Sequence, residues 1–232
     1  KDGKKVGVSS NSHEAIKNLL SEIEKQAKDE GFKFKGMKKS NNTNLFEGEF
    51  IIDVINDKPI NTKDFLLFSG TAWFFSNVRM NQTLDYLFID EAGQVSLANT
   101  ISMATSSRNL VLIGDQMQLS QPIRGTHEGY AKLSSLDYIL EDRDTISPEQ
   151  GIFLRETRRL NKKICKYISD SFYDSRLIPH EVTKTRSVKL GLNNIEDQGI
   201  FFIPTDHFGN SQRSDEEAQI IYDYYSKIMM KN

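Results

Sequence analysis

The chain has 232 residues, a length that suits one large or two small domains with a hydrophobic core. Its 30 lysine and arginine residues and 32 aspartate and glutamate residues give a formal net charge of −2, which excludes nucleic-acid binding through a globally basic surface but leaves a local track open. A single cysteine, Cys165, excludes an intrachain disulfide and a cysteine-rich metal site. No apolar run is long enough to span a bilayer. We therefore expect a cytoplasmic protein without a membrane partner.

The first predicted element is a short strand at residues 6–8, which ends in a polar segment of serine and asparagine. Apolar residues then recur at helical spacing, at Ile16, Leu19, Leu20 and Ile23. Asn11 followed three residues later by Glu14 is a variant of the residue pair that caps helix N-termini. The chain is therefore predicted to open with a strand, a polar loop and a helix.

Four apolar runs of strand length follow, at residues 50–55, 65–68, 86–89 and 110–113. Between the last two runs, apolar residues at helical spacing indicate a helix around residues 97–101. Strands that are apolar throughout are typical of a parallel sheet with helices on both faces. The predicted fold class is therefore α/β, with a parallel sheet covered by helices.

The pattern restarts in the last third of the chain. Apolar runs predict strands at residues 152–154 and 200–203, and helical spacing predicts helices around residues 164–172 and 218–228. Two strands are too few to complete a second sheet.

Turn-forming residues separate the two patterns, at Asp144, Ser147 and Pro148. We therefore predict a first domain over residues 1–146 and the N-terminal part of a second domain over residues 147–232. No internal repeat is visible in the sequence.

The strongest local signal is Leu87-Phe88-Ile89-Asp90-Glu91-Ala92, a buried strand followed by two adjacent carboxylates. The carboxyl ends of strands form the usual ligand edge of an open α/β sheet. Because side chains alternate along a strand, we expect Asp90 to hold Mg²⁺ and Glu91 to polarise the water that attacks a phosphate. Considered without its context, such a pair is more often an acidic turn after a core strand.

A second apolar run ends in Gly114, Asp115 and, three residues later, Gln118. Glycine lets the backbone approach a ligand closely, and a glutamine amide can donate to a phosphate oxygen and accept from water. An ordinary turn is again the alternative. The two runs are one helix apart, which is the spacing that the sheet of a nucleotide-driven motor needs.

These segments resemble motifs of superfamily 1 helicases. Ile89-Asp90-Glu91-Ala92 resembles the Walker B motif, and Gly114-Asp115-Gln116-Met117-Gln118-Leu119 resembles motif III, with Ser120 where the first proline is common. Val8-Ser9-Ser10-Asn11-Ser12-His13-Glu14-Ala15 resembles motif Ia. Ser69-Gly70-Thr71-Ala72 resembles the Gly-Thr segment that lies between motif Ia and Walker B.

Two more matches lie in the second half. Leu154-Arg155-Glu156-Thr157-Arg158-Arg159-Leu160 resembles motif IV, usually T-Y-R-M, with Arg158 in place of the tyrosine and Leu160 in place of the methionine. Ser214-Asp215-Glu216-Glu217-Ala218 resembles a later helix start. The matches follow the family's order over nearly the whole chain. They are most similar to those of the large Upf-like helicases and of bacterial proteins that fuse the motor to a RecB-like nuclease.

The resemblance implies a RecA-like sheet of the P-loop NTPase fold, followed by the start of a second RecA-like domain. It implies ATP and Mg²⁺ as cofactors and single-stranded DNA or RNA as the track. The residues implied as catalytic are Glu91, Gln118 and Arg159. Those implied to bind the nucleotide and its Mg²⁺ are Asp90, Gly114, Asp115, Gln118 and Arg159, with Asp90 as the metal ligand. Those implied to contact nucleic-acid phosphates are Ser10, Asn11 and Thr71.

The family's phosphate loop, G-x-x-x-x-G-K-[ST], does not occur in the sequence. The family places it upstream of motif Ia, and places motifs V and VI beyond the last helix. We therefore expect an internal piece of a longer protein with attached domains, and a piece that is inactive alone. Two alternatives are a nucleic-acid-binding module without turnover and a Mg²⁺-dependent nuclease that uses Asp90 and Glu91, with Asp115 as the candidate third carboxylate.

Several assignments have plain structural alternatives. Ser10 and Asn11 could cap a helix instead of contacting phosphates. The aromatic residues 73–75 could stack on bases or pack into the core. Arg159 could be an ordinary surface charge in a run of arginines, or, through its planar guanidinium, a two-point contact to a γ-phosphate.

Overall fold

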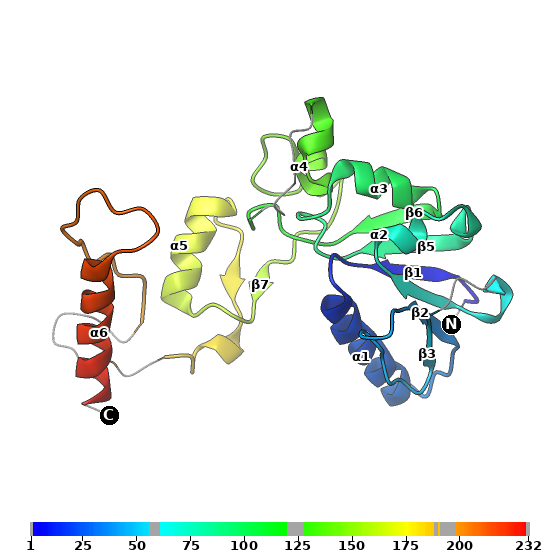
Figure 1. Cartoon of the computed structure of the whole chain (residues 1–232), viewed down its shortest axis with the longest axis horizontal. Coiled ribbons are helices and arrows are strands. Elements are labelled where there is room, and N and C mark those ends of the chain that lie inside the picture. Colours follow the sequence, from blue (N-terminus) through cyan, green and yellow to red (C-terminus); the bar gives the residue numbers. More distant parts are fainter. Residues whose placement is uncertain (1, 56–60, 120–127, 188–189, 191–197, 231–232) are drawn as a thin grey trace. The chain divides into compact units, whose positions relative to one another are not determined.

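The computed structural model describes residues 2–55, 61–119, 128–187, 190 and 198–230 (Figure 1). The chain forms two compact units, residues 1–142 and 143–232. Each is described by itself below, as unit 1 and unit 2. The assignment of the two units to RecA-like domains stays a prediction.

Six parallel strands form the sheet of unit 1, in the order β3-β2-β4-β1-β5-β6. Their bounds are β1 Val6–Ser9, β2 Gly36–Lys39, β3 Ile51–Val54, β4 Leu67–Gly70, β5 Leu84–Ile89 and β6 Ser107–Leu112. Because these strands are parallel, their carboxyl ends lie at one edge of the sheet. The predicted α/β class with a parallel sheet is confirmed, and the arrangement is consistent with a RecA-like P-loop fold.

Helices lie on both faces of this sheet. Their bounds are α1 His13–Asp29, α2 Ala72–Phe75, α3 Leu97–Ala104 and α4 Ser135–Leu140, with 3-10 helices η1 Thr62–Asp64, η2 Val78–Met80 and η3 Gly129–Lys132. Val8 packs against α1 residues Ile16 and Leu20, whereas the Ser9 hydroxyl contacts the Met103 sulfur of α3 at 3.4 Å. Neighbouring residues of a strand point to opposite faces, so α1 and α3 cover opposite sides.

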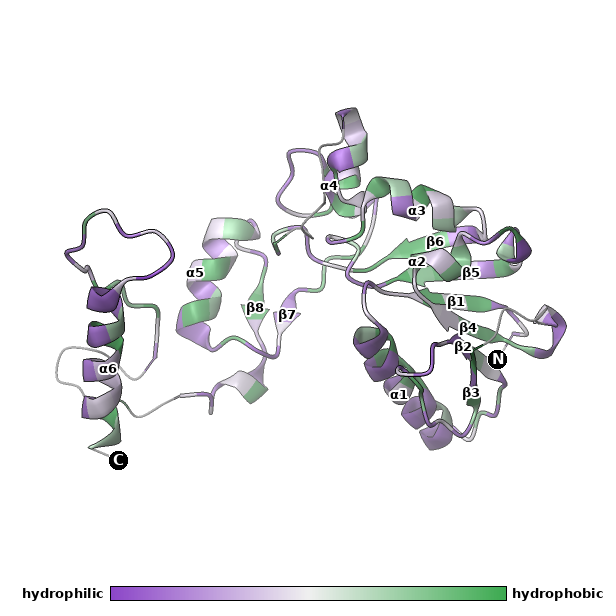
Figure 2. Ribbon diagram, viewed as in Figure 1, coloured by the Kyte–Doolittle hydropathy of each residue, from purple (hydrophilic) through white to green (hydrophobic). Residues whose placement is uncertain are grey.

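The α1 face is only partly covered. Figure 2 shows the apolar character of the strands and the hydrophilic outer side of α1. Beside α1, an apolar cavity of about 670 Å³ reaches Phe88 of β5 and Ile113, just beyond β6. The sheet is thus covered on this side over β1 and β4 and more open toward β5 and β6.

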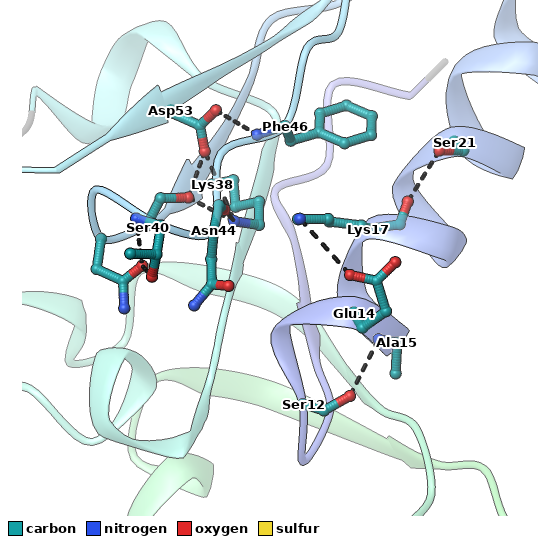
Figure 3. A network of polar contacts seen from close by, with 12 residues as sticks. Ser12, Glu14, Ala15, Lys17, Ser21, Lys38, Ser40, Asn44, Phe46 and Asp53 are labelled. Carbon is teal, nitrogen blue, oxygen red and sulfur yellow. Dashed lines mark hydrogen bonds and ion pairs between the residues drawn. The ribbon is translucent and has the colours of Figure 1, made fainter.

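Strand β2 was not predicted from the sequence, since half of its residues are lysines. The Lys38 side chain is fully buried, at 0% exposure, and its ammonium donates to the Ser40 hydroxyl and the Asn44 carbonyl oxygen (Figure 3). It lies 3.6 Å from a carboxylate oxygen of Asp53, on β3. Asp53 also accepts from the Phe46 backbone N–H at 2.6 Å. The buried ammonium is therefore paired and hydrogen-bonded, the condition under which an interior tolerates charge.

Unit 2 contains a two-stranded parallel sheet and helices. The bounds are β7 Glu156–Thr157, β8 Ile178–Pro179, α5 Lys162–Phe172, η4 Glu181–Thr183 and α6 Asp215–Met229. Helices α5 and α6 confirm the two predicted from apolar spacing. Among the described residues of the whole chain, no helix is long and apolar enough to cross a membrane.

The strands predicted at residues 152–154 and 200–203 are wrong. Both segments lack strand structure, and Ile152, Leu154 and Phe202 are exposed. An apolar run becomes a strand only where a neighbouring strand accepts and donates its backbone hydrogen bonds. In the described part of unit 2 the pairing instead joins Glu156–Thr157 to Ile178–Pro179.

An arginine holds the start of unit 2 to the end of its first helix. The Arg176 guanidinium donates to the Thr145 hydroxyl at 2.6 Å and to the Ile146 carbonyl oxygen at 2.9 Å. Its guanidinium carbon also lies 4.5 Å from the centre of the Phe153 ring. Thr145 in turn donates to Asp174 at 2.6 Å. This polar cluster therefore joins residues 145–146 to the segment that follows α5.

Replacing Asp53 with alanine should lower the free energy of unfolding by about 3–5 kcal/mol, because Lys38 would remain buried without a counter-charge. Urea denaturation followed by circular dichroism measures the change. Asp170→Ala is the control: Asp170 pairs with Lys166 at 2.6 Å on an exposed helix face, where water screens the pair, so stability should change little. Equal effects at Asp53 and Asp170 would contradict the buried ion pair.

Candidate functional site

The predicted motif segments of unit 1 come together at the carboxyl ends of four adjacent strands, β4, β1, β5 and β6. The strand register aligns them closely. Gly70 pairs with Ser9, Ser9 pairs with Ile89, and Ile89 pairs with Leu112. The residues that follow each of these four leave the sheet at the same edge.

The acidic segment leaves β5 through a turn. The Asp90 backbone N–H donates to the Ser9 carbonyl oxygen at 2.8 Å, and Glu91 has a φ of 54°, in the left-handed region. A non-glycine residue there carries a backbone strain of about 1–2 kcal/mol, which is typical of functional sites. The strand alternation from which different roles were predicted for Asp90 and Glu91 therefore does not apply to this pair. Strand β5 ends at Ile89, and both carboxylates lie in the turn that follows.

Two glycines bring the loops after β5 and β6 into direct contact. A Cβ atom on Gly93 would lie 2.3 Å from the Asp115 carbonyl oxygen, and one on Gly114 would lie 2.8 Å from the Ala92 nitrogen. The Ala92 N–H also donates to the Ile113 carbonyl oxygen at 2.8 Å. Only glycine permits this approach of backbone to backbone. The two loops are therefore in direct backbone contact.

Asp115 shapes the loop that presents Gln118. One oxygen of its carboxylate accepts from the Met117 backbone N–H at 3.0 Å, and the other lies 3.5 Å from the Gln118 amide nitrogen. Gln118 itself is exposed. Asp115 thus has a structural function in the loop, and its predicted contact with a nucleotide stays a prediction. Ser120, the departure from motif III, lies outside the described residues.

The helix after β1 begins differently from the prediction. Its cap is Ser12, whose hydroxyl accepts from the Ala15 backbone N–H at 3.1 Å (Figure 3). Glu14 instead forms an ion pair with Lys17 at 3.5 Å. The capping pair predicted for Asn11 and Glu14 is therefore wrong. It follows that Asn11, which is exposed, is not used as the helix cap.

Two buried polar atoms beside this helix lack partners within the described part of the chain: the Ser10 hydroxyl oxygen and the His13 Nδ1. An unsatisfied buried polar atom is costly and calls for an explanation such as a ligand. Burial lowers the pKa of His13 below its usual value, and the positive charges of Lys38 and Lys17 lower it further. His13 is therefore a neutral imidazole at pH 7.

The residues of the Gly-Thr segment and the aromatic residues after it differ in how far they are buried. Thr71 precedes α2 but its side chain makes no capping hydrogen bond. Phe75 is fully buried, whereas Trp73 is exposed. The structure therefore assigns the packing alternative to Phe75 and leaves Trp73 on the surface.

Arg159 lies in unit 2, in the loop between β7 and α5. Its backbone N–H donates to the Thr157 hydroxyl at 3.2 Å, and its carbonyl oxygen accepts from Arg186 at 3.2 Å. Its side chain is exposed, as are those of Arg155 and Arg158. The loop is thus anchored through its backbone, and the predicted γ-phosphate contact of Arg159 stays a prediction.

The described residues contain no group of three or more histidine, cysteine, aspartate or glutamate side chains that could hold a metal ion. A nuclease site built from Asp90, Glu91 and Asp115 therefore finds no support here. Mg²⁺ binding by Asp90 stays a prediction, and it would need fewer protein ligands, because this ion is usually bound through one or two carboxylates with water and substrate phosphates as the others.

A comparison with curated proteins finds a helicase. The chain is 31% identical over 148 residues to DNA polymerase alpha-associated DNA helicase A of Schizosaccharomyces pombe. The match covers 61% of this chain and 21% of that helicase, so the chain spans about a fifth of the relative's length. No protein-family model matches the chain. The similarity supports a relation to DNA helicases and nothing finer.

Gly93→Ala should lower the free energy of unfolding by about 3 kcal/mol, because the new carbon would collide with backbone that cannot move aside. Gly31→Ala is the control: its site is open, and only its left-handed φ of 62° is unfavourable, at a cost of about 1–2 kcal/mol. Urea denaturation of both variants measures the difference. A Gly93 variant as stable as the native chain would show that the two loops are not in contact.

Proposed function

We propose that this chain is part of an ATP-dependent superfamily 1 helicase, which couples nucleotide hydrolysis to translocation along single-stranded DNA or RNA. The observation that carries the proposal is the alignment of four motif-like segments at one edge of a parallel sheet. The contact between the loops that resemble Walker B and motif III adds to it. The similarity to a DNA helicase supports the same class of protein.

In this proposal Asp90 and Glu91 act on the nucleotide. Asp90 provides a carboxylate oxygen for Mg²⁺, and Glu91 holds and polarises the attacking water. Mg²⁺-ATP, when bound, supplies the phosphoryl group and the charge neutralisation that the transfer requires. The strained turn at Glu91 supports this assignment, because such a backbone persists only where its surroundings hold it.

In this proposal, the contact between the loops after β5 and β6 lets the bound nucleotide change the position of the loop that carries Gln118. Gln118 contacts the γ-phosphate in the proposal, and its loop touches the turn of Glu91 through Gly114 and Gly93. Arg159 contacts the same phosphate from unit 2. In the proposal, loss of the γ-phosphate removes both contacts, and this change drives the single strand forward by one step.

The nucleic acid lies, in this proposal, across the ends of β1 and β4, where Ser10, Asn11 and Thr71 contact phosphates. Contacts to phosphates position a strand without reading its sequence. Three observations support the assignment. The Ser10 hydroxyl is buried without a partner among the described residues, Asn11 does not cap a helix, and Thr71 makes no capping hydrogen bond.

A binding module without turnover is the second candidate. The sequence has no G-x-x-x-x-G-K-[ST], and this loop supplies the backbone cradle, the lysine and the metal-binding hydroxyl of P-loop enzymes. ATP hydrolysis therefore belongs, in our proposal, to a longer protein that contains this chain together with such a loop. A cytoplasmic location and further attached domains are parts of the same proposal.

The 232-residue chain by itself should release no phosphate from ATP above the level of its Glu91→Gln variant, since the phosphate cradle is absent from the sequence. Steady-state phosphate release with and without single-stranded oligonucleotide measures this. Turnover that exceeds the Glu91→Gln variant would contradict it. In a protein that also carries a phosphate loop, the same substitution should reduce turnover by about 10²–10⁴-fold.

In that ATP-hydrolysing protein, Arg159→Ala should reduce nucleic-acid-stimulated hydrolysis by about 10³-fold or more, as expected for an arginine that stabilises the transferred phosphoryl group. ADP affinity should change little, because ADP has no γ-phosphate. Arg159→Lys should not restore activity, because lysine lacks the planar two-point contact.

Arg155 and Arg158 provide matched controls, since both are exposed arginines of the same segment. Alanine at either position should leave hydrolysis nearly unchanged. A large loss at Arg158 instead of Arg159 would shift the motif by one residue. Small and equal losses at all three would mean an ordinary charged surface.

A further inference from the structure

The chain's single tryptophan, Trp73, is one of its most exposed side chains, at 89% exposure. Tryptophan is usually highly buried, because its ring carries a large apolar surface. The residues next to it are not exposed in this way. Phe74 lies against Gly70, and its ring centre is 4.9 Å from that of Phe75, which is fully buried. The exposure is therefore a property of Trp73 and not of a loose segment.

Helix α2 holds Trp73 outward because its neighbours are anchored. The Phe75 ring lies against the sheet, 2.9 Å from where a Cβ on Gly7 would be. Ser76 closes the helix with two hydrogen bonds to the Ala72 carbonyl oxygen, from its backbone N–H at 2.9 Å and its hydroxyl at 2.8 Å. The indole could enter the core only if this turn unwound.

Trp73 stands at the same edge of the sheet as the proposed phosphate contacts. It lies three residues beyond Gly70, the end of β4, whose pairing partner is Ser9 of β1. The exposed residues that follow α2 are mostly polar, with Val78 as the exception. Apart from Val78, the exposed side chains that directly follow α2 thus form no apolar run of the kind expected for a protein-binding patch.

We propose that Trp73 stacks on one base of the single strand whose phosphates Ser10, Asn11 and Thr71 contact. The inference rests on the proposed function and adds a second kind of contact to it. Every base has a π-face, so a stacking tryptophan strengthens binding without selecting sequence. This suits a motor that must move along any strand, and it supplies affinity that the net charge of −2 does not.

The single tryptophan makes the test direct, because all indole fluorescence of the chain comes from Trp73. An oligothymidylate of about 16 nucleotides, long enough for a typical single-strand site, is titrated at low salt. Binding is measured separately by the fluorescence anisotropy of a 5′-labelled oligonucleotide. We expect the tryptophan fluorescence to be quenched with the same saturation curve as the anisotropy. An abasic strand of equal length, which keeps the phosphates, should bind more weakly and quench little.

Variants separate stacking from other roles of the side chain. Trp73→Ala should weaken oligothymidylate binding about tenfold, the typical contribution of one stacked base. Trp73→Phe keeps an aromatic face and should remain within about threefold of the native affinity. Val78→Ala is the matched control, since Val78 is an apolar side chain five residues further along with a similar exposure, 85%, and this variant should bind as the native chain does.

Each other outcome identifies what has failed. Binding by anisotropy without tryptophan quenching, or equal quenching by the abasic strand, would overturn the stacking and leave the proposed function intact. Equal losses of oligothymidylate affinity for Trp73→Ala and Val78→Ala would mean that apolar contact of any kind supports binding, and would overturn the stacking. No anisotropy change with any strand would overturn the nucleic-acid track itself, and the stacking with it.

Discussion

The arrangement of unit 1 depends on the parallel register of four neighbouring strands. Gly70, Ser9, Ile89 and Leu112 form a continuous row across β4, β1, β5 and β6. Parallel strands deliver their following loops to one edge, so segments far apart in sequence meet there. A shift of one residue in any pairing would turn the side chains of that strand to the opposite face and separate the loops.

Directly after that row, the backbones of the loops that follow β5 and β6 are in contact. Gly93 and Gly114 remove the side chains that would keep the loops after β5 and β6 apart. The same contact surrounds the left-handed backbone of Glu91, which the free chain would seldom adopt. In the proposed function, this contact is the element through which a ligand at one loop would move the other.

Polar contacts hold the two strands at the other end of the sheet order, β3 and β2. Glu24 of α1, almost fully buried, accepts hydrogen bonds from three successive backbone N–H groups at the start of β3, those of Glu49, Phe50 and Ile51. On the next strand, Lys38 and Asp53 form the buried ion pair that ties β2 to β3. Burial lowers the pKa of Lys38, and the charge of Asp53 opposes that shift. These polar contacts therefore hold β2 and β3 in place, where half of the β2 residues are lysines.

The sequence by itself determined the α/β class, the helices α1, α3, α5 and α6 and the order of the motif-like segments, because apolar spacing and short motifs are local properties. It could not reveal β2, whose buried lysine needs Asp53 from β3, nor the cap at Ser12, nor the absence of strands at 152–154 and 200–203. It also left the aromatic residues 73–75 undecided. Those outcomes depend on which backbone groups, charges and rings meet, and distant residues come together only when the sheet forms.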